Sequence, residues 1–356
     1  RATRRHRVDH GRGFHQSGAG ATCAMAIAIV TGGAAMNQVK HRAEDISLHG
    51  EMRYQEPMRR HTSWHAGGYA QRAYVPFDLA DLSRFLRSHP AGEAIRMIGL
   101  GSNILVRDGG LRGTTVLLHR ALNETRLSAA PDGGGVIYVE AGVAAPKLAR
   151  FAAQSKLDGA EFFAGIPGTI GGAIAMNAGC YGTETWDFIV SVTTVDRLGR
   201  LRERGPEDYE IGYRSVKLKA SDAGGPPMGD ETDPVEEWFV AAHFAFPPGE
   251  TAASERKIKE LLDRRLATQP IGQPNAGSVF RNPTGHHAAR LIESCGLRGL
   301  TIGGAQVSTK HANFIVNLGT ASAADIENLI EKVYSVVKQQ QGIELEREIR
   351  IIGEKA

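Results

Sequence analysis

The sequence predicts an α+β protein with several domains, and three patterns support this prediction. Strand-like and helix-like segments alternate over residues 50–120, and strand-like segments dominate residues 120–245. Residues 248–356 carry two amphipathic helical patterns and a final alternating segment. A length of 356 residues suits two or three domains, and a hydrophobic content of 42% is enough for their cores.

The first predicted domain covers residues 50–119. Asp78 is placed to cap a helix with one apolar face. The residues of this face are Leu79, Leu82, Phe85 and Leu86. The predicted strands that follow are Ala94–Ile98, Ile104–Val106 and Thr114–Leu118. Glycines separate these strands, as expected for tight turns.

The second predicted domain covers residues 120–247. Val136–Glu140 and Phe188–Asp196 are expected to be strands, and Asp196–Gly199 is a plausible hairpin turn. Pro146 suits the first turn of a short helix. The stretch 220–236 is rich in glycine, proline and acidic residues, so we expect a flexible surface insertion there.

The third predicted domain covers residues 248–356. Its first helical pattern has an apolar face formed by Ile258, Leu261, Leu262 and Leu266. The face of the second is formed by Ile326, Leu329, Ile330, Val333 and Val337. Apolar and charged residues then alternate over residues 343–351, which predicts a strand whose charged face carries Glu344, Glu346, Glu348 and Arg350.

Charge and cysteine content exclude several function classes. The net charge is +3, and the first twelve residues alone carry +4, from five arginines and one aspartate. The rest is therefore nearly neutral, without the basic patch of a nucleic-acid binder. Residues 1–49 are expected to be a disordered extension, although Cys23–Val30 imitates the apolar part of a signal peptide.

No apolar run is long enough to cross a membrane. The three cysteines, Cys23, Cys180 and Cys295, are far apart and show no metal-ligand spacing. This usage fits a reducing cytoplasm, so we expect a cytoplasmic protein without a metal site. A monomer is the expected oligomeric state.

Two glycine-rich segments stand out, Gly99–Leu105 and Ala164–Gly179. Neither matches the dinucleotide-binding fingerprint or a P-loop. Glycines let the backbone approach a pyrophosphate, and Ser102, Asn103 and Thr169 add side-chain donors. Composition alone supports an alternative equally well, in which both segments are tight turns between packed strands.

Five motifs in order resemble those of the UDP-N-acetylenolpyruvoylglucosamine reductase family, in its compact subclass. They are Gly99–Asp108, Glu161–Ala173, Tyr213–Ser215, Ala276–Pro283 and Leu345–Arg350. The resemblance implies a flavin-binding fold like that of vanillyl-alcohol oxidase. Residues 50–119 and 120–247 would be its two FAD-binding subdomains, and residues 248–356 would bind the UDP-sugar. It also implies noncovalent FAD and NADPH as electron donor.

The first two motifs imply the cofactor-binding residues. These are Gly99, Gly101, Ser102, Asn103, Ile104, Gly165, Ile166, Pro167, Gly168, Thr169, Gly171, Gly172 and, slightly beyond, Asn177. One departure from the family pattern is His65, which precedes Ala66-Gly67-Gly68. We expect His65 to lie in a surface loop.

The implied reaction is reduction of UDP-N-acetylglucosamine enolpyruvate to UDP-N-acetylmuramate. A hydride reaches the β-carbon of the double bond through the flavin, and a proton must reach the α-carbon. The resemblance points to Ser278 as proton donor. Without it, a turn-capping serine would be the simpler interpretation of Ser278.

Arg214 would clamp the substrate carboxylate with its planar donor fork, whereas its simplest alternative is a surface salt bridge. Glu348 is the second carboxylate stabiliser by resemblance. An ionised glutamate would repel the developing charge, so we expect Glu348 to be protonated or neutralised by Arg214 or Arg350. Strand parity alone does not choose among the glutamates of its face.

Further substrate contacts are implied at Tyr213, Asn282, His311 and Arg350. Arg264 and Arg265 could meet the pyrophosphate of the UDP-sugar. His286 and His287 are adjacent and are interpreted as surface residues rather than metal ligands. Two other functions remain open, a different flavoenzyme such as an oxidase on the same fold, and a nucleotide-sugar binder without flavin.

Overall fold

The computed structural model describes residues 47–130, 133–219 and 236–356, and the described residues belong to one compact unit. Most of the expected N-terminal extension and almost all of the insertion at 220–236 lie outside these ranges, as does Cys23.

The first sheet is built from four strands in the order β1-β2-β5-β3. Their bounds are β1 Glu51–Pro57, β2 Tyr69–Val75, β3 Ile95–Ile98 and β5 Leu111–Leu117. β1 and β2 are antiparallel, whereas β5 runs parallel to both β2 and β3. Helix α1 (Leu79–Ser88) crosses between β2 and β3, and the Asp78 carboxylate accepts a hydrogen bond from the Asp81 N–H at 2.7 Å. The predicted cap and its helix are confirmed.

The second sheet is antiparallel, in the order β11-β10-β14-β7-β6. The strands are β6 Thr125–Ala129, β7 Gly135–Glu140, β10 Ile189–Asp196, β11 Leu201–Arg204 and β14 Glu237–Phe246. Helices α2 (Ala145–Gln154) and α3 (Ile170–Ala175) share a buried core with this sheet. Asp196–Gly199 forms the hairpin turn between β10 and β11, with Gly199 at φ +71°.

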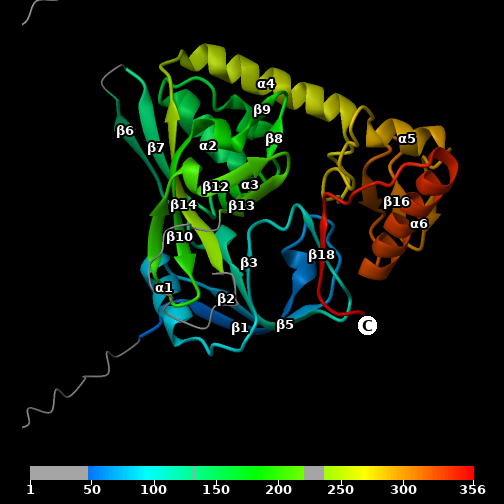
Figure 1. Cartoon of the computed structure of the whole chain (residues 1–356), viewed down its shortest axis with the longest axis horizontal. Helices are drawn as coiled ribbons and strands as arrows, with labels where there is room; N and C mark the ends of the chain where they lie inside the picture. The colour runs from blue at the N-terminus through cyan, green and yellow to red at the C-terminus, as the bar shows by residue number, and fades with distance from the viewer. Residues whose placement is uncertain (1–46, 131–132, 220–235) are drawn as a thin grey trace, which may run out of the picture. The chain divides into compact units, whose positions relative to one another are not determined.

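Two small hairpins and a long helix complete this part of the chain. The hairpins are β8 (Gly179–Cys180) with β9 (Thr183–Glu184), and β12 (Tyr209–Gly212) with β13 (Ser215–Leu218). Helix α4 (Thr251–Thr268) packs on α2 and runs toward the C-terminal elements (Figure 1).

The face predicted for α4 is only partly buried. Ile258 is buried, but Leu266 is 58% exposed. The apolar spacing correctly predicts a helix here, but the neighbouring elements cover only its first half.

The C-terminal elements pack around α6 (Ala323–Gln341), in a core that also contains Trp64, Ala66 and Leu105 from the first part of the chain. The five residues of its predicted apolar face are all buried. The other elements are α5 Ala288–Ser294, β15 Thr301–Ile302, β16 Ala305–Val307 and β17 Ile315–Asn317. Asp108, from the first glycine-rich motif, accepts hydrogen bonds from the N–H groups of Ala323 and Ala324 at 3.0 and 2.8 Å. This contact ties the start of α6 to the first motif.

The long strand predicted over residues 343–351 is wrong. Only Arg350–Ile352 forms a strand, β18, and it pairs in parallel with β4 (Ile104–Val106). The preceding residues make one isolated bridge, between Phe280 and Arg347. The segment bonds first to the C-terminal elements and then to β4, so it bends between two partners instead of continuing one ladder (Figure 1).

Candidate active site

Arg214 occupies a strained position in a tight hairpin. Gly212 and Ser215 pair across β12 and β13, so Tyr213 and Arg214 form a two-residue loop. The φ of Arg214 is +54°, in the left-handed region that glycine and asparagine favour. Strained residues persist where surrounding contacts hold them, and they cluster at functional sites.

Three contacts hold the Arg214 guanidinium. Its Nε donates to Glu348 Oε1 at 2.8 Å, and its Nη1 and Nη2 donate to the carbonyl oxygens of Asn177 and Gly179 at 3.2 and 2.9 Å. The side chains of Arg214 and Glu348 are only 17% and 15% exposed. The structure therefore joins two residues that are 134 positions apart in the sequence.

The structure also distinguishes the glutamates that strand parity could not separate. Glu344 and Glu346 are exposed and pair with Lys338 and Arg281. Glu348 is half-buried against Arg214. We expected Glu348 to be either protonated or neutralised by an arginine, and the contact with Arg214 corresponds to the second state.

Ser278 lies beside this ion pair along the backbone. The Glu348 N–H donates to the carbonyl oxygen of Val279, the next residue after Ser278, at 2.8 Å. Gly277, with φ +77°, supplies the left-handed turn before it. Ser278 is half-buried, and among the described residues its hydroxyl makes no hydrogen bond. The alternative in which Ser278 caps a turn therefore gains no support.

The two glycine-rich segments meet in space. A Cβ on Gly99 would lie 2.3 Å from Thr169 Oγ1, and one on Gly168 would lie 3.1 Å from Ser102 Oγ. Gly101, at φ +61°, passes so close to the His61 carbonyl that a Cβ would lie 2.0 Å from it. Glycine is therefore required sterically where the first motif turns.

The remaining residues of the second motif are mostly buried. Ile166, Gly168 and Thr169 are buried, and Pro167 is exposed. Thr169 caps α3 through a 3.5 Å bond from the Gly172 N–H. The last three glycines implied as cofactor-binding residues also have close neighbours. A Cβ on Gly165 would approach Cys180, one on Gly171 would approach Ala141, and one on Gly172 would approach Thr169.

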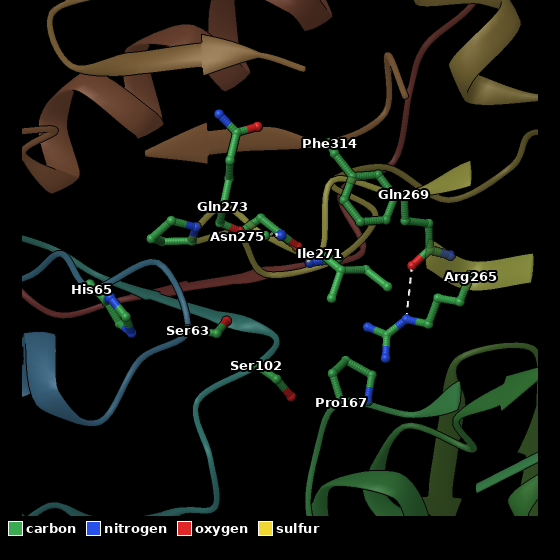
Figure 2. Close-up of a pocket in the computed structure, with 13 residues that line it drawn as sticks. Ser63, His65, Ser102, Pro167, Arg265, Gln269, Ile271, Gln273, Asn275 and Phe314 are labelled. Atoms are coloured by element: carbon green, nitrogen blue, oxygen red, sulfur yellow. Dashed lines mark hydrogen bonds between the residues drawn. The ribbon is translucent and has the colours of Figure 1, made fainter. Parts of the chain in front are cut away.

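A cavity of about 420 Å³ opens where these segments meet the C-terminal elements. Figure 2 shows Ser102 and Pro167, one from each glycine-rich segment, with Arg265 beside them. Further lining residues are Ser63, His65, Gln269, Ile271, Gly277 and Phe314. His65 is an exposed loop residue, as expected, and it also lines this cavity.

The cavity fits part of a flavin nucleotide. Its volume lies within the range of ligand sites, and Ser102 and Pro167 bring the two glycine-rich segments to its wall. Gly277, which also lines it, has open space where a Cβ would stand. Serine hydroxyls and one guanidinium supply polar contacts for a phosphate-bearing ligand.

Only one of the two candidate pyrophosphate arginines lines the cavity. Burial lowers the pKa of Arg265, whose Nε donates to Gln269 Oε1 at 3.0 Å. No carboxylate pairs with Arg265 among the described residues. Arg264 is exposed, and its guanidinium lies 5.3 Å from the centre of the Tyr181 ring. Arg265 is thus the arginine placed to receive an anion.

The implied substrate contacts fall at different depths. Tyr213 lies with its ring 5.0 Å from the Arg214 guanidinium, and burial, followed by the Glu348 carboxylate, raises its pKa. His311 packs on Phe314, a cavity residue, and burial lowers its pKa. Asn282 is exposed, and its side chain accepts a bond from the Ala288 N–H at 3.1 Å, at the start of α5.

Asn103 and Arg350 join the first motif to the segment that carries Glu348. Asn103 Nδ2 donates to the Glu348 carbonyl at 3.2 Å, and the Asn103 carbonyl accepts from the Arg350 N–H at 2.9 Å. The Arg350 side chain is exposed. Ile104, the next residue of the motif, pairs with Arg350 in the β4–β18 ladder.

Sequence reasoning missed Arg281 and Glu184. Arg281 Nη2 donates to the Arg214 carbonyl at 3.2 Å, and Arg281 Nη1 pairs with Glu346 at 3.0 Å. Glu184 accepts a 2.6 Å bond from Asn177. Arg281 lies inside the motif that contains Ser278, but nothing in the spacing indicates a contact 67 residues away.

No group of three potential metal ligands occurs within the part of the chain that the structure describes. His286 and His287 are exposed, as expected. Burial raises the pKa of the Cys180 thiol to about 11. No helix in the described ranges combines the length and hydropathy needed to cross a bilayer.

Comparisons with known proteins agree with this geometry. The FAD binding domain family matches residues 71–205, and the C-terminal domain of UDP-N-acetylenolpyruvoylglucosamine reductase matches residues 269–352. The reductase of Nitrosospira multiformis is 56% identical over 327 residues, which cover 90% of this chain and 94% of that protein. The reductase of Thiobacillus denitrificans is 56% identical over 317 residues, covering 86% and 94%.

A solved structure is similar throughout. The crystal structure of UDP-N-acetylenolpyruvylglucosamine reductase from Thermus caldophilus matches with a TM-score of 0.66 at 28% identity. The match covers 86% of this chain and 99% of that one. It confirms the predicted fold class, an FAD-binding fold followed by a substrate-binding domain. On these relationships, the chain belongs to the UDP-N-acetylenolpyruvoylglucosamine reductase family.

Proposed function

We infer that the chain reduces UDP-N-acetylglucosamine enolpyruvate to UDP-N-acetylmuramate, a step of peptidoglycan precursor synthesis, with FAD as cofactor and NADPH as reductant. The family relationship supports this activity, and so does the FAD binding domain match. The observation that carries the assignment of residues is the Arg214–Glu348 pair beside Ser278, close to a cavity lined by both glycine-rich segments.

The residues that would hold FAD are those of the two meeting segments. Gly99–Ile104 and Gly165–Gly172 offer backbone N–H groups, and Ser102 offers a hydroxyl at the cavity wall. The chemistry that FAD supplies when bound is transfer of a hydride from NADPH to the β-carbon of the enolpyruvyl group.

Ser278 would give the proton to the α-carbon. A serine hydroxyl is a weak acid, but a carbanion-like centre is a strong base, and fixed geometry lowers the entropic barrier. The Ser278 hydroxyl has no hydrogen-bond partner in the described ranges, so it is free to donate to a substrate.

Arg214 would bind the substrate carboxylate and stabilise the charge that builds there. Three of the five guanidinium N–H groups are used internally, so one N–H remains on each terminal nitrogen. Glu348 would orient Arg214 through the Nε bond while Arg214 neutralises its charge.

Arg265 would receive the pyrophosphate of the UDP-sugar, because its guanidinium lines the cavity without an acidic partner in the described ranges. Tyr213 and His311 border the same region through Arg214 and Phe314, which favours them as substrate contacts. Tyr213, Asn282, Arg350 and Arg264 are exposed, so their contacts would be made at the rim, whereas His311 is half-buried.

Three further assignments belong to this proposal. Residues 50–119 and 120–247 would be the FAD-binding subdomains and residues 248–356 the substrate-binding domain. The first two ranges carry separate main sheets, and one buried cluster that includes Tyr74 and Val240 joins them. The enzyme would act as a monomer. It would work in the cytoplasm, where its NADPH and its UDP-sugar are available.

The test is an anaerobic experiment in two steps. The enzyme is first reduced with NADPH and then mixed with UDP-N-acetylglucosamine enolpyruvate, while flavin absorbance is followed. Ser278→Ala should leave the first step nearly unchanged and slow the second by about 10²- to 10⁴-fold, the usual contribution of a general acid. Ser335→Ala, on the exposed side of α6, is the control. Equal slowing of both steps by Ser278→Ala would contradict the assigned role.

A further inference from the structure

The Arg214 guanidinium is held by main-chain carbonyl groups, and one buried side chain determines where these groups lie. We propose that Asn177 is a positioning residue that aims Arg214 at the substrate carboxylate, and that its side chain does not contact the cofactor. The inference rests on the proposed function, because the role of Arg214 as carboxylate clamp belongs to that proposal.

The side chain of Asn177 is fully used inside the protein. Its Nδ2 donates to Glu184 Oε2 at 2.6 Å and to the Gly212 carbonyl at 3.3 Å, and its Oδ1 accepts from the Trp186 N–H at 3.2 Å. Asn177 is 1% exposed. Both amide hydrogens are engaged, so none remains for a flavin phosphate or ring.

Asn177 acts on Arg214 from two sides. Its carbonyl accepts directly from Arg214 Nη1, and its side chain holds Gly212, which begins the loop that carries Arg214. Gly179, two residues after Asn177, accepts from Nη2. One residue therefore helps to place both the backbone of the Arg214 loop and the tip of its side chain.

The conformation of this region favours asparagine. Six non-glycine residues in the described ranges have positive φ, and three of them are Asn177 (+39°), Tyr181 (+58°) and Arg214 (+54°). Asparagine tolerates the left-handed region better than most residues. Glu184 is itself fixed, because its N–H donates to Asp187 Oδ2 at 2.8 Å in a capping box. The strain is thus concentrated in one rigid frame around Arg214.

A loosened frame would leave Arg214 charged but badly aimed. The two N–H groups left for a carboxylate give a strong bidentate contact only when the fork is correctly oriented. A displacement of about 1 Å at a reacting centre is enough to cost about a hundredfold in rate.

The first experiment uses Asn177→Gly, because glycine keeps the left-handed backbone while the whole side chain and its three hydrogen bonds are removed. We expect unchanged flavin content and unchanged reduction by NADPH, with reoxidation by the enolpyruvyl substrate slowed by about 10- to 100-fold. The matched control is Asn317→Ala. Asn317 is also buried and also makes three side-chain bonds, to Trp64, Gly319 and Ala321. Loss of flavin from Asn177→Gly alone would overturn the inference in favour of a cofactor contact.

The second experiment combines Asn177→Gly with Arg214→Ala. If Asn177 acts only through Arg214, the double variant reoxidises as slowly as Arg214→Ala alone. If the double variant reoxidises more slowly than Arg214→Ala by the factor that Asn177→Gly alone produces, the inference is overturned. Asn177→Asp should be at least as slow as Asn177→Gly, because it sets a carboxylate against Glu184. Adding Glu184→Gln should recover part of the rate, since the hydrogen bond then forms in the opposite direction.

The same proteins provide a test that needs no turnover. Thermal unfolding without substrate should show a smaller loss of Tm in the Asn177→Gly/Arg214→Ala variant than the sum of the single losses. In the control, the Tm loss of the Asn317→Ala/Arg214→Ala variant should equal the sum of the two single losses. If Arg214→Ala does not slow reoxidation, the proposed function fails while this coupling still decides the positioning role. Additive losses at positions 177 and 214 would refute it.

Discussion

Replacing Arg214 by glycine and, separately, by alanine should separate the strain at this position from its contacts. Both variants lose the guanidinium, the Glu348 pair and the bonds to two carbonyl groups. They differ only in backbone preference. At φ +54° a residue with a Cβ is strained by about 1–2 kcal/mol, whereas glycine is not.

Glycine elsewhere is less stable than alanine by about 0.5–1 kcal/mol, because it loses more chain entropy on folding. At position 214 the two effects oppose each other, and the strain is larger. We therefore expect Arg214→Gly to be more stable than Arg214→Ala by about 1 kcal/mol. That difference corresponds to a Tm about 1–2 °C higher in a chain of 356 residues, because the entropy of unfolding grows with chain length.

The loss that both variants share has its own origin. Glu348 is 15% exposed, and without Arg214 its carboxylate keeps no cationic partner in the described ranges. Leaving one member of a largely buried pair uncompensated costs about 2–3 kcal/mol here, somewhat less than for full burial. Glu348→Gln added to Arg214→Ala should recover about half of that cost.

The assay is urea unfolding followed by circular dichroism, beside turnover measurements on the same preparations. Both variants should be equally inactive, because neither offers a donor fork to the substrate. If Arg214→Gly is less stable than Arg214→Ala, the strain assigned to Arg214 is absent. If Arg214→Ala keeps turnover, the assignment of its guanidinium to catalysis is wrong.

Three further predictions concern other parts of the molecule. Burial, followed by the nearby charges of His61 and Arg120, lowers the pKa of His119 to about 4 from its ordinary value of 6.5. The unfolded chain therefore binds more protons between pH 6.5 and 4, so stability should fall as the pH drops through that window. His119→Gln should flatten this slope in unfolding curves, and an unchanged slope would assign it to another group. Arg265→Ala should raise the KM for the UDP-sugar by about 10- to 100-fold, whereas Arg264→Ala should change it less than about threefold; equal effects would contradict the assignment of the pyrophosphate. Asp108→Ala should cost about 1 kcal/mol, because it removes the carboxylate that caps α6, and a Tm unchanged from the parent would show that the cap is not needed.

Local patterns predicted the elements that depend on local interactions. The cap at Asp78 and the apolar spacing of α6 depend only on residues a few positions apart, and both are confirmed. The strand over residues 343–351 failed because periodicity reports which residues are apolar, not which neighbour the backbone bonds. Likewise, Leu266 has the spacing of a buried helix face, but its side chain is exposed in the structure.

The candidate site also contains residues that the sequence indicated and contacts that it did not. The resemblance of motifs pointed to Arg214, Ser278 and Glu348, and the structure brings them into one neighbourhood. For Asn177 the motif indicated a cofactor contact, whereas the structure commits its side chain to Glu184, Gly212 and Trp186. Glu184 and Trp186 are only 7 and 9 positions from Asn177, but the turn that brings them together follows no helical or strand period, and Gly212 is 35 positions away. Neither periodicity nor the motif therefore indicated these bonds.

Because β18 pairs in parallel with β4, the position of the Glu348 side chain depends on the number of residues that precede β18 more than on their identity. Arg350–Ile352 are locked to Ile104–Val106, and on the other side Arg347 is bridged to Phe280. A residue inserted or deleted between these anchors would have to be absorbed within two positions, and a slip by one residue turns each side chain to the opposite face. The Glu348 carboxylate would then leave the Arg214 guanidinium, although both residues are still present in the sequence. Homologues that differ freely in loop length elsewhere should therefore keep the count of residues from 347 to 350 constant.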